Sequence, residues 1–183
     1  MPAPSHNQTD QELIAAVNAG DDQAFAILYE RHRDWVVQLA YRFTGHHDDA
    51  LDVLQETFAY FVRKFPGFVL TAQLTTFFYP AVRNLSIAAR KKRQRVSSGD
   101  TEMERFAAAE PADSMDRDDF SDLLQTMSDQ HREILMMRFV DGMTQPEIAA
   151  ALDIPLGTVK SRLHHAIQSV KNSPAAARLA ADI

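Results

Sequence analysis

Residues 143–171, MTQPEIAAALDIPLGTVKSRLHHAIQSVK, carry the clearest structural signal in the chain. Their pattern predicts two short helices joined by a tight turn. Thr144 and Glu147 have the spacing of a capping box at the start of the first helix, and Pro155 follows a break in the apolar period. The second helix has apolar residues at i, i+4, i+7 and i+8, namely Val159, Leu163, Ala166 and Ile167. Together these features predict a helix-turn-helix.

The exposed side of the second helix is polar and contains no acid between Pro155 and Lys171. Its side chains form hydrogen bonds and have lengths that can reach phosphates or base edges. An ordinary helical hairpin whose polar face meets only water is the alternative, and the turn length and the missing acids favour DNA binding. The candidate contacts are Thr158, Lys160, Ser161, Arg162, His164 and His165.

Length and composition limit the class of protein. The chain has 183 residues, which fits one large or two small domains, and 45% of them are hydrophobic. No run of 18 apolar residues occurs, so we expect no membrane insertion, and the first residues do not resemble a secretory signal. The absence of cysteine excludes disulfides, thiolate metal sites and a cysteine nucleophile.

The net charge of −6 is unevenly distributed. Residues 1–99 contain 11 basic and 10 acidic side chains, residues 100–122 contain 2 and 9, and residues 123–183 contain 6 and 6. The middle segment therefore supplies the whole excess of acid. Because nucleic-acid binding depends on local basic patches, the acidic total does not argue against it.

The remaining chain predicts helices and no strands. Thr9 and Glu12 form a second capping box, and Pro80 should kink its helix or delay the helix start. We expect an all-α protein with two small helical domains at residues 9–97 and 119–172, joined by a flexible acidic linker at 98–118, with a disordered start at 1–8 and a tail at 173–183. The expected helices outside the helix-turn-helix are 10–19, 21–43, 48–65, 74–95, 120–127 and 129–140.

Two polar surfaces of the first domain have two interpretations each. Asp52, Gln55 and Glu56 lie opposite the apolar stripe of the third helix and form either a solvated face or a partner surface. The fourth helix ends in RKKRQR, residues 90–95, with five positive charges in six positions. A solvated helix end is possible, but the upstream Tyr79 and Asn84 favour a nucleic-acid surface.

Histidines offer no metal site. His32 lies on a core face without a second ligand at i+3 or i+4, and the side chains of His46 and His47 diverge because they are adjacent. No catalytic constellation is visible, so we expect no cofactor and no enzyme activity.

Six motifs in order resemble the bacterial sigma factors of the extracytoplasmic-function group. They are D-Q-E-L (10–13), G-D-D-Q-A-F (20–25), A-L-D-V-L-Q-E-T-F (50–58), V-R-N-L-S-I (82–87), H-R-E-I-L (131–135) and E-I-A-A-A-L-D-I-P-L-G-T-V-K-S-R-L (147–163). The resemblance covers nearly the whole chain outside the linker and tails. It implies an initiation subunit that binds RNA polymerase core and promoter DNA, with an anti-sigma factor as a further partner.

The resemblance also implies residue roles. Asp52, Gln55 and Glu56 would bind polymerase core. Lys160, Ser161, His164 and His165 would read the minus-thirty-five element, while Thr158 and Arg162 would hold phosphates. The minus-ten element would be opened by the loop before the fourth helix and by the helix itself, through Phe68, Thr71, Gln73, Tyr79, Arg83, Asn84, Arg90 and Lys91.

Two other functions stay open at this point. A helix-turn-helix regulator with a helical sensor domain explains the second domain equally well but leaves the basic fourth helix unexplained. A helical adaptor that binds only protein predicts no salt-dependent affinity for DNA. A polymerase subunit would work in the cytoplasm.

Overall fold

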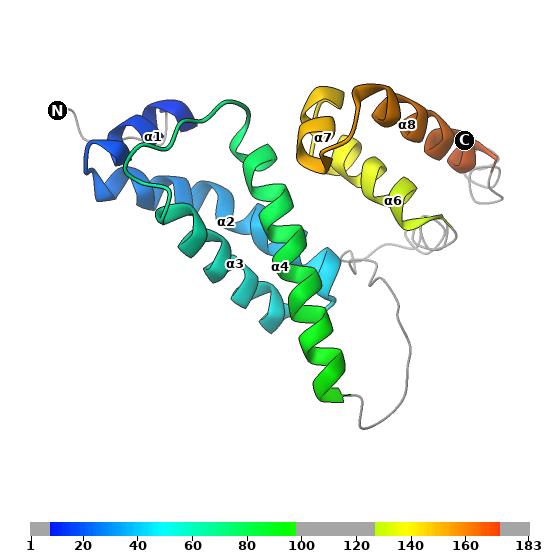
Figure 1. Ribbon diagram of the computed structural model, residues 1–183, viewed down its shortest axis with the longest axis horizontal. Helices are drawn as coiled ribbons and strands as arrows, with labels where there is room; N and C mark the ends of the chain where they lie inside the picture. Colours follow the sequence, from blue (N-terminus) through cyan, green and yellow to red (C-terminus); the bar gives the residue numbers. More distant parts are fainter. Residues whose placement is uncertain (1–7, 98–126, 173–183) are drawn as a thin grey trace, which may run out of the picture. The chain divides into compact units, whose positions relative to one another are not determined.

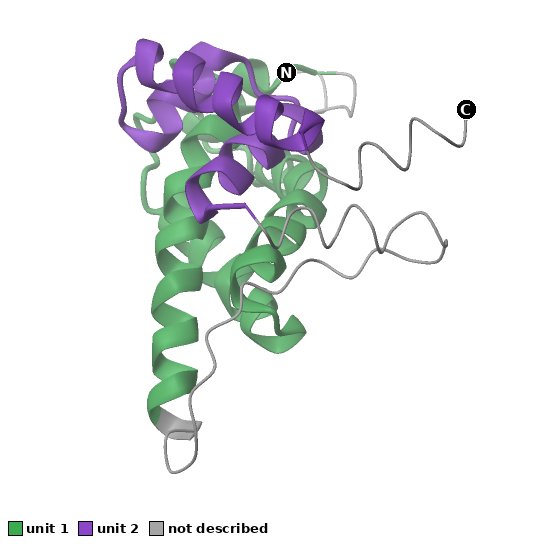
Figure 2. Ribbon diagram, turned by 90° about the vertical axis from the view of Figure 1, so that its right-hand side faces the viewer, with its two compact units in different colours: residues 1–107 green, residues 108–183 purple. Residues whose placement is uncertain are grey.

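The computed structural model describes residues 8–97 and 127–172 and divides the chain into two compact units, residues 1–107 and 108–183 (Figure 2). Every regular element in the described ranges is a helix, which confirms the all-α prediction. The predicted linker, the tail, residues 1–7 and the predicted helix 120–127 up to residue 126 lie outside the described residues.

The described part of unit 1, residues 8–97, contains four helices, α1 Asp10–Asn18, α2 Asp22–Thr44, α3 His47–Val62 and α4 Leu74–Ser97 (Figure 1). Helix α2 packs against α1, α3 and α4, and α3 also packs against α4. Helix α2 is therefore the centre of the unit.

Local sequence sets the helix ends. Thr9 and Glu12 form the predicted capping box, in which Glu12 N donates to Thr9 Oγ1 at 3.3 Å and Thr9 N donates to Glu12 Oε2 at 2.7 Å. Gly45 ends α2 with φ 69°. Helix α3 ends at Val62, earlier than predicted, because Lys64 N and Phe65 N turn back to carbonyls only three residues away.

The core of unit 1 is aromatic. The rings of Phe58 and Phe61 on α3 lie 5.2 and 5.1 Å from the ring of Phe78 on α4, and all three side chains are buried. Pro80 lies inside α4, which nevertheless begins at Leu74. Of the two expected effects of Pro80, a delayed helix start does not occur, because packing of the first turn outweighs one missing hydrogen bond, and a kink stays a prediction.

Unit 2 contains α6 Asp129–Leu135, the π-helix η1 Met136–Val140, α7 Gln145–Leu152 and α8 Leu156–Lys171. Helices α6 and α7 both pack on α8. Residues 129–140 were expected to form one α-helix, but Asp141 N bonds to Met136 O five residues back at 3.0 Å. In this wider turn Met137 is buried, whereas Phe139 is 66% exposed.

Candidate nucleic-acid interface

The turn between α7 and α8 is built by three residues. Asp153 takes the left-handed conformation with φ 52°, and Ile154 N donates to Ala149 O at 3.1 Å, so α7 stops sharply. Pro155 then provides the carbonyl to which Thr158 N donates at 2.9 Å. The capping box of Thr144 and Glu147 fixes the other end of α7, as predicted. The two helices therefore have a locally defined geometry.

Helix α8 has a fully formed buried face and a polar outer face. Val159, Leu163 and Ala166 are buried against α6 and α7. At 100° per residue, Ser161 and Gln168 lie opposite that face. The predicted contacts do not include Gln168, although its position seven residues after Ser161 places it on the same outer face of the helix.

The six predicted contacts of α8 occupy this outer face and its flanks. Lys160, Ser161, His164 and His165 are exposed. Thr158 and Arg162 are half-buried and, being four residues apart, lie on the same flank of the apolar face. The outer face of α8 thus presents two basic side chains, hydroxyls and imidazoles and no carboxylate.

In unit 1 the loop between α3 and α4 begins with an aromatic side chain, Phe68, which packs into the core. The Phe68 ring lies 5.4 Å from Phe61 and 4.8 Å from Phe77, so it packs inward and is half-buried. Val69 is 74% exposed, and Thr71 and Gln73 are exposed. The loop therefore combines a fixed beginning with an accessible second half.

This loop forms one wall of a pocket of about 490 Å³. The other walls come from the start of α1 and from α2. Among the predicted site residues, Gln73 lines the pocket. The lining residues from α1 and α2 could not be identified from local sequence patterns, because only the tertiary fold brings them next to the loop. The lining residues are Thr9, Asp10, Gln11, Arg31, Leu70, Ala72 and Gln73.

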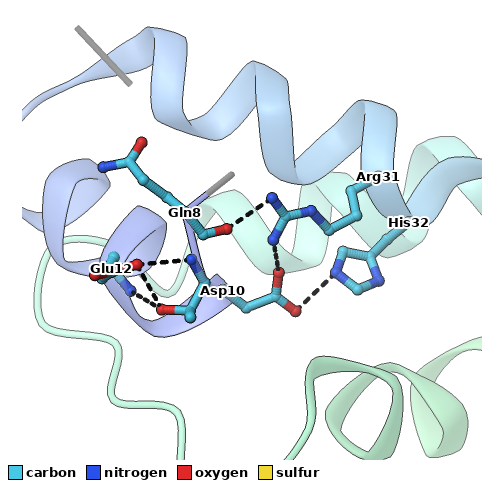
Figure 3. Close-up of polar contacts among 6 residues, drawn as sticks. Gln8, Asp10, Glu12, Arg31 and His32 are labelled. Carbon is cyan, nitrogen blue, oxygen red and sulfur yellow. Dashed lines mark hydrogen bonds and ion pairs between the residues drawn. The ribbon is translucent and has the colours of Figure 1, made fainter. Parts of the chain in front are cut away.

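Asp10 organises the polar side of this pocket (Figure 3). Its carboxylate lies 2.6 Å from Arg31 Nη1 and 2.9 Å from His32 Nε2, and Arg31 Nη2 also donates to Gln8 O at 2.8 Å. Burial alone would raise the pKa of Asp10, but the hydrogen bonds and charges of His32 and Arg31 hold it below its ordinary value. The carboxylate therefore stays ionised and fixes the Arg31 guanidinium at the pocket.

Helix α4 carries the remaining predicted DNA contacts. Asn84 and Lys91 are exposed, and Arg83 and Arg90 are half-buried. Tyr79 is only 1% exposed and its ring lies 6.3 Å from that of Phe43 on α2. The prediction of Tyr79 as a DNA contact is wrong, because α4 packs against α2 as well as α3 and buries a second stripe of side chains.

The outer face of α3 is a separate surface. Asp52, Gln55 and Glu56 are all exposed, which a solvated face and a partner surface both predict. Leu51 is 38% exposed and Val62 47% exposed on the same helix. The face is therefore acidic with apolar side chains beside the acids, a mixture suited to protein contacts.

Two absences apply to the described ranges, 8–97 and 127–172. No group of three or more His, Cys, Asp or Glu side chains there could hold a metal ion. No helix in those ranges is long and apolar enough to cross a membrane.

Comparisons with known families match the two units separately. The family model described as "Sigma-70 region 2" matches residues 28–96, and "Sigma-70, region 4" matches residues 123–172. The first spans most of α2 through α4, and the second spans α6 through α8.

Curated relatives match most of the chain. It is 28% identical over 179 residues to the "ECF RNA polymerase sigma factor SigW" of Bacillus subtilis, covering 88% of this chain and 94% of the relative. It is also 28% identical over 183 residues to the "ECF RNA polymerase sigma-E factor" of Escherichia coli strain K12, covering 92% and 95%.

Two solved structures share the fold. CnrH, in complex with the cytosolic domain of CnrY, has a TM-score of 0.65 at 22% identity and covers 95% of this chain and 99% of its own. The sigma factor RpoE of Bartonella quintana, in complex with the anti-sigma factor NepR, has a TM-score of 0.58 at 24% identity and covers 82% and 93%.

Proposed function

We propose that this chain, which belongs to the extracytoplasmic-function group of RNA polymerase sigma factors, reads two promoter elements through separate surfaces on its two units. The chain binds RNA polymerase core and directs promoter recognition, DNA melting and transcription initiation. The observation that carries the residue-level proposal is the outer face of α8, which holds Lys160 and Arg162 and no acid.

Helix α8 lies in the major groove of the minus-thirty-five element in this proposal. Ser161, His164 and His165 contact base edges from the outer face of α8, and Lys160 reaches the base edges from one flank of that face. Thr158 and Arg162 hold phosphates from the opposite flank, which they share, and one backbone strand bordering the groove would pass there.

The minus-ten element is opened at the pocket of unit 1. Taking a base out of the duplex costs a few kcal/mol, which new contacts to the base must offset. The loop residues Leu70, Ala72 and Gln73 provide an apolar and amide wall, and Arg31 provides a fixed cation opposite. Thr71 and the predicted α4 side chains Arg83, Asn84, Arg90 and Lys91 then follow the displaced strand, while Phe68 supports the loop from inside.

Polymerase core docks on the outer face of α3 through Asp52, Gln55 and Glu56. Exposed Leu51 and Val62 add apolar contact area beside the charges. Partner proteins also include an anti-sigma factor, because RpoE of Bartonella quintana is solved with the anti-sigma factor NepR. The chain acts as a binding subunit without catalytic chemistry, at the polymerase in the cytoplasm.

In vitro transcription tests the proposal. The full chain and the core polymerase of its own bacterium are incubated with a template library randomised at both promoter elements, and transcripts are sequenced. We expect initiation that depends on the added chain and enrichment at two elements. A regulator with a helix-turn-helix would bind DNA without core-dependent initiation, and that result would refute the residue-level proposal for unit 1.

The Lys160→Ala, Arg162→Ala double variant separates the two surfaces. We expect it to lose enrichment at the minus-thirty-five element and to keep enrichment at the minus-ten element. Equal loss at both elements would contradict the assignment of α8 to one element.

A further inference from the structure

The side-chain amide of Asn18, the last residue of α1, holds the loop before α4. Asn18 Oδ1 accepts from Gly67 N at 2.6 Å and from Phe68 N at 3.2 Å, and Asn18 Nδ2 donates to Phe68 O at 2.9 Å. The two residues that it grips are about fifty positions away in sequence. One planar amide therefore satisfies three main-chain groups at the beginning of the loop.

Asn18 is well placed for this contact because α1 is itself fixed. Leu13 and Ile14 are buried, and Asp10 pairs with Arg31 and His32 on α2. An amide supplies both a donor and an acceptor on one rigid group, whereas a carboxylate accepts only and an aliphatic side chain does neither. Asparagine therefore supplies both the acceptor that the two main-chain N–H groups need and the donor that the main-chain carbonyl needs.

The gripped peptide needs glycine. Gly67 has φ 103°, a conformation that residues with a Cβ rarely adopt. The following Phe68 side chain enters the aromatic cluster with Phe61 and Phe77. The loop is thus anchored through its backbone by Asn18 and through its side chain by Phe68.

The other end of the loop is also anchored. Gln73 O accepts from Thr76 N at 3.1 Å and from Phe77 N at 3.3 Å, which starts α4. Between the two anchors lie residues 69–73, which include three pocket-lining residues, Leu70, Ala72 and Gln73. The anchors therefore set the shape of the pocket wall.

We propose that Asn18 is a positioning residue for opening of the minus-ten element, because it keeps the loop in the shape that receives an unstacked base. This inference rests on the proposed function of the pocket. A loop ordered beforehand loses little further conformational freedom on binding, so more of the contact free energy remains for holding the base.

The test measures how strongly binding depends on the captured base. Holoenzyme, assembled from core polymerase and the full chain, is titrated with fluorescent single-stranded oligonucleotides of the minus-ten non-template strand, each lacking the base at one position. For the parent chain we expect one position at which loss of the base weakens binding most. The ratio of intact to abasic affinity at that position is the readout.

Asn18→Ala should reduce this ratio by about tenfold, the loss expected when several neutral hydrogen bonds to the loop are removed. Asn18→Asp keeps an oxygen that can accept the two main-chain N–H groups, but it replaces the donating nitrogen by a carboxylate oxygen next to Phe68 O. We therefore expect the ratio to fall as much as in Asn18→Ala or somewhat less. The matched control is Gln38→Ala, which removes an exposed amide from α2 in the same unit. It should keep the parental ratio.

The outcomes are distinct. A variant that is only partly folded binds intact and abasic strands equally less, so its ratio is unchanged, and an unchanged ratio in both Asn18 variants overturns the inference. A parent chain with no position sensitive to base loss overturns the proposed pocket and the inference together. A reduced ratio in the variants, with polymerase binding kept, supports both.

Discussion

Arg93 and Asp49 form a bidentate ion pair that ties the basic end of α4 to the first turn of α3. Arg93 Nε lies 2.7 Å from Asp49 Oδ2, and Arg93 Nη2 lies 2.9 Å from Asp49 Oδ1. One cation of the RKKRQR segment therefore holds the fold together, whereas the neighbouring Lys91 is exposed. The basic segment combines a structural residue with candidate DNA contacts.

This pair predicts acid sensitivity of unit 1. The hydrogen bond from Arg93 lowers the pKa of Asp49, and the pKa of Asp10 is lowered by His32 and Arg31 against the effect of burial. Both carboxyls therefore contribute stability that is present above their ordinary value of 3.8 and is lost as pH falls through the lower folded values. We expect the free energy of unfolding to fall steeply below that pH.

Asp49→Asn should lower the stability of unit 1 by about 1 kcal/mol at neutral pH, because Arg93 is partly exposed and the pair is partly screened. The same variant should lose part of the acid dependence. Trp35, the one tryptophan of the chain, lies in α2 and reports unfolding of unit 1 by fluorescence in urea. Asp34→Asn, on an exposed carboxylate, is the control. An unchanged acid dependence in Asp49→Asn would contradict the role of the pair.

Tyr79 should matter for stability and not for DNA contact. Tyr79→Ala should destabilise unit 1 by about 3–5 kcal/mol, the usual loss for a large buried ring. Tyr79→Phe keeps the ring, so we expect a loss of at most about 1.5 kcal/mol and unchanged affinity for minus-ten single strands. Urea unfolding followed through Trp35 and binding of fluorescent oligonucleotides measure the two effects. A stable Tyr79→Phe protein with much weaker DNA binding would restore Tyr79 as a DNA contact.

The error over Tyr79 shows where sequence reasoning stops. Helix ends were predictable because capping is local, as the boxes at Thr9 and Thr144 demonstrate. The width of the buried face of α4 was not predictable from the sequence, because it depends on how many helices pack against α4. Ser86 of α4 is also fully buried, because α4 packs against both α2 and α3.

The pocket was predictable on one side only. The resemblance pointed to the loop before α4, and Gln73, one of its predicted contacts, lines the pocket. Asp10, Arg31 and Asn18 carried no such signal, because their roles arise from contacts across 21 to 50 residues of sequence. The sequence MMRFV likewise contains no local feature that predicts the π-helix η1.

Charge reversal on α3 should weaken binding to core polymerase. The Asp52→Arg, Glu56→Arg double variant places cations where a complementary partner surface expects acids, so we expect roughly a tenfold or greater loss of affinity. The Glu30→Arg, Asp34→Arg variant is a matched control, with the same residue types and the same spacing on an exposed part of α2. Titration of labelled chain with core polymerase measures both. Equal affinity of the two double variants would show that α3 is only a solvated face.

His164 and His165 predict a pH-dependent contact with the minus-thirty-five element. Both side chains are exposed on the outer face of α8, and their rings lie 5.7 Å apart. The other charged side chains of α8 are the cations Lys160, Arg162 and Lys171. Phosphates of bound DNA would favour the protonated form of a neighbouring imidazole, so binding should take up protons.

Because a neighbouring phosphate favours the protonated form of an imidazole, affinity for duplex minus-thirty-five DNA should rise as pH falls from about 8 to about 6. The sign follows because the DNA-bound state holds more protons than the free state, and lower pH favours the state that holds more. The His164→Gln, His165→Gln variant keeps hydrogen bonding but does not titrate, so its affinity should change less over this range. His46→Gln, His47→Gln, on an exposed pair in unit 1, is the matched control and should retain the parental slope. Fluorescence anisotropy of the full chain at constant ionic strength measures these affinities. Equal slopes of affinity against pH for the parent and the α8 variant would mean that both histidines only flank the groove.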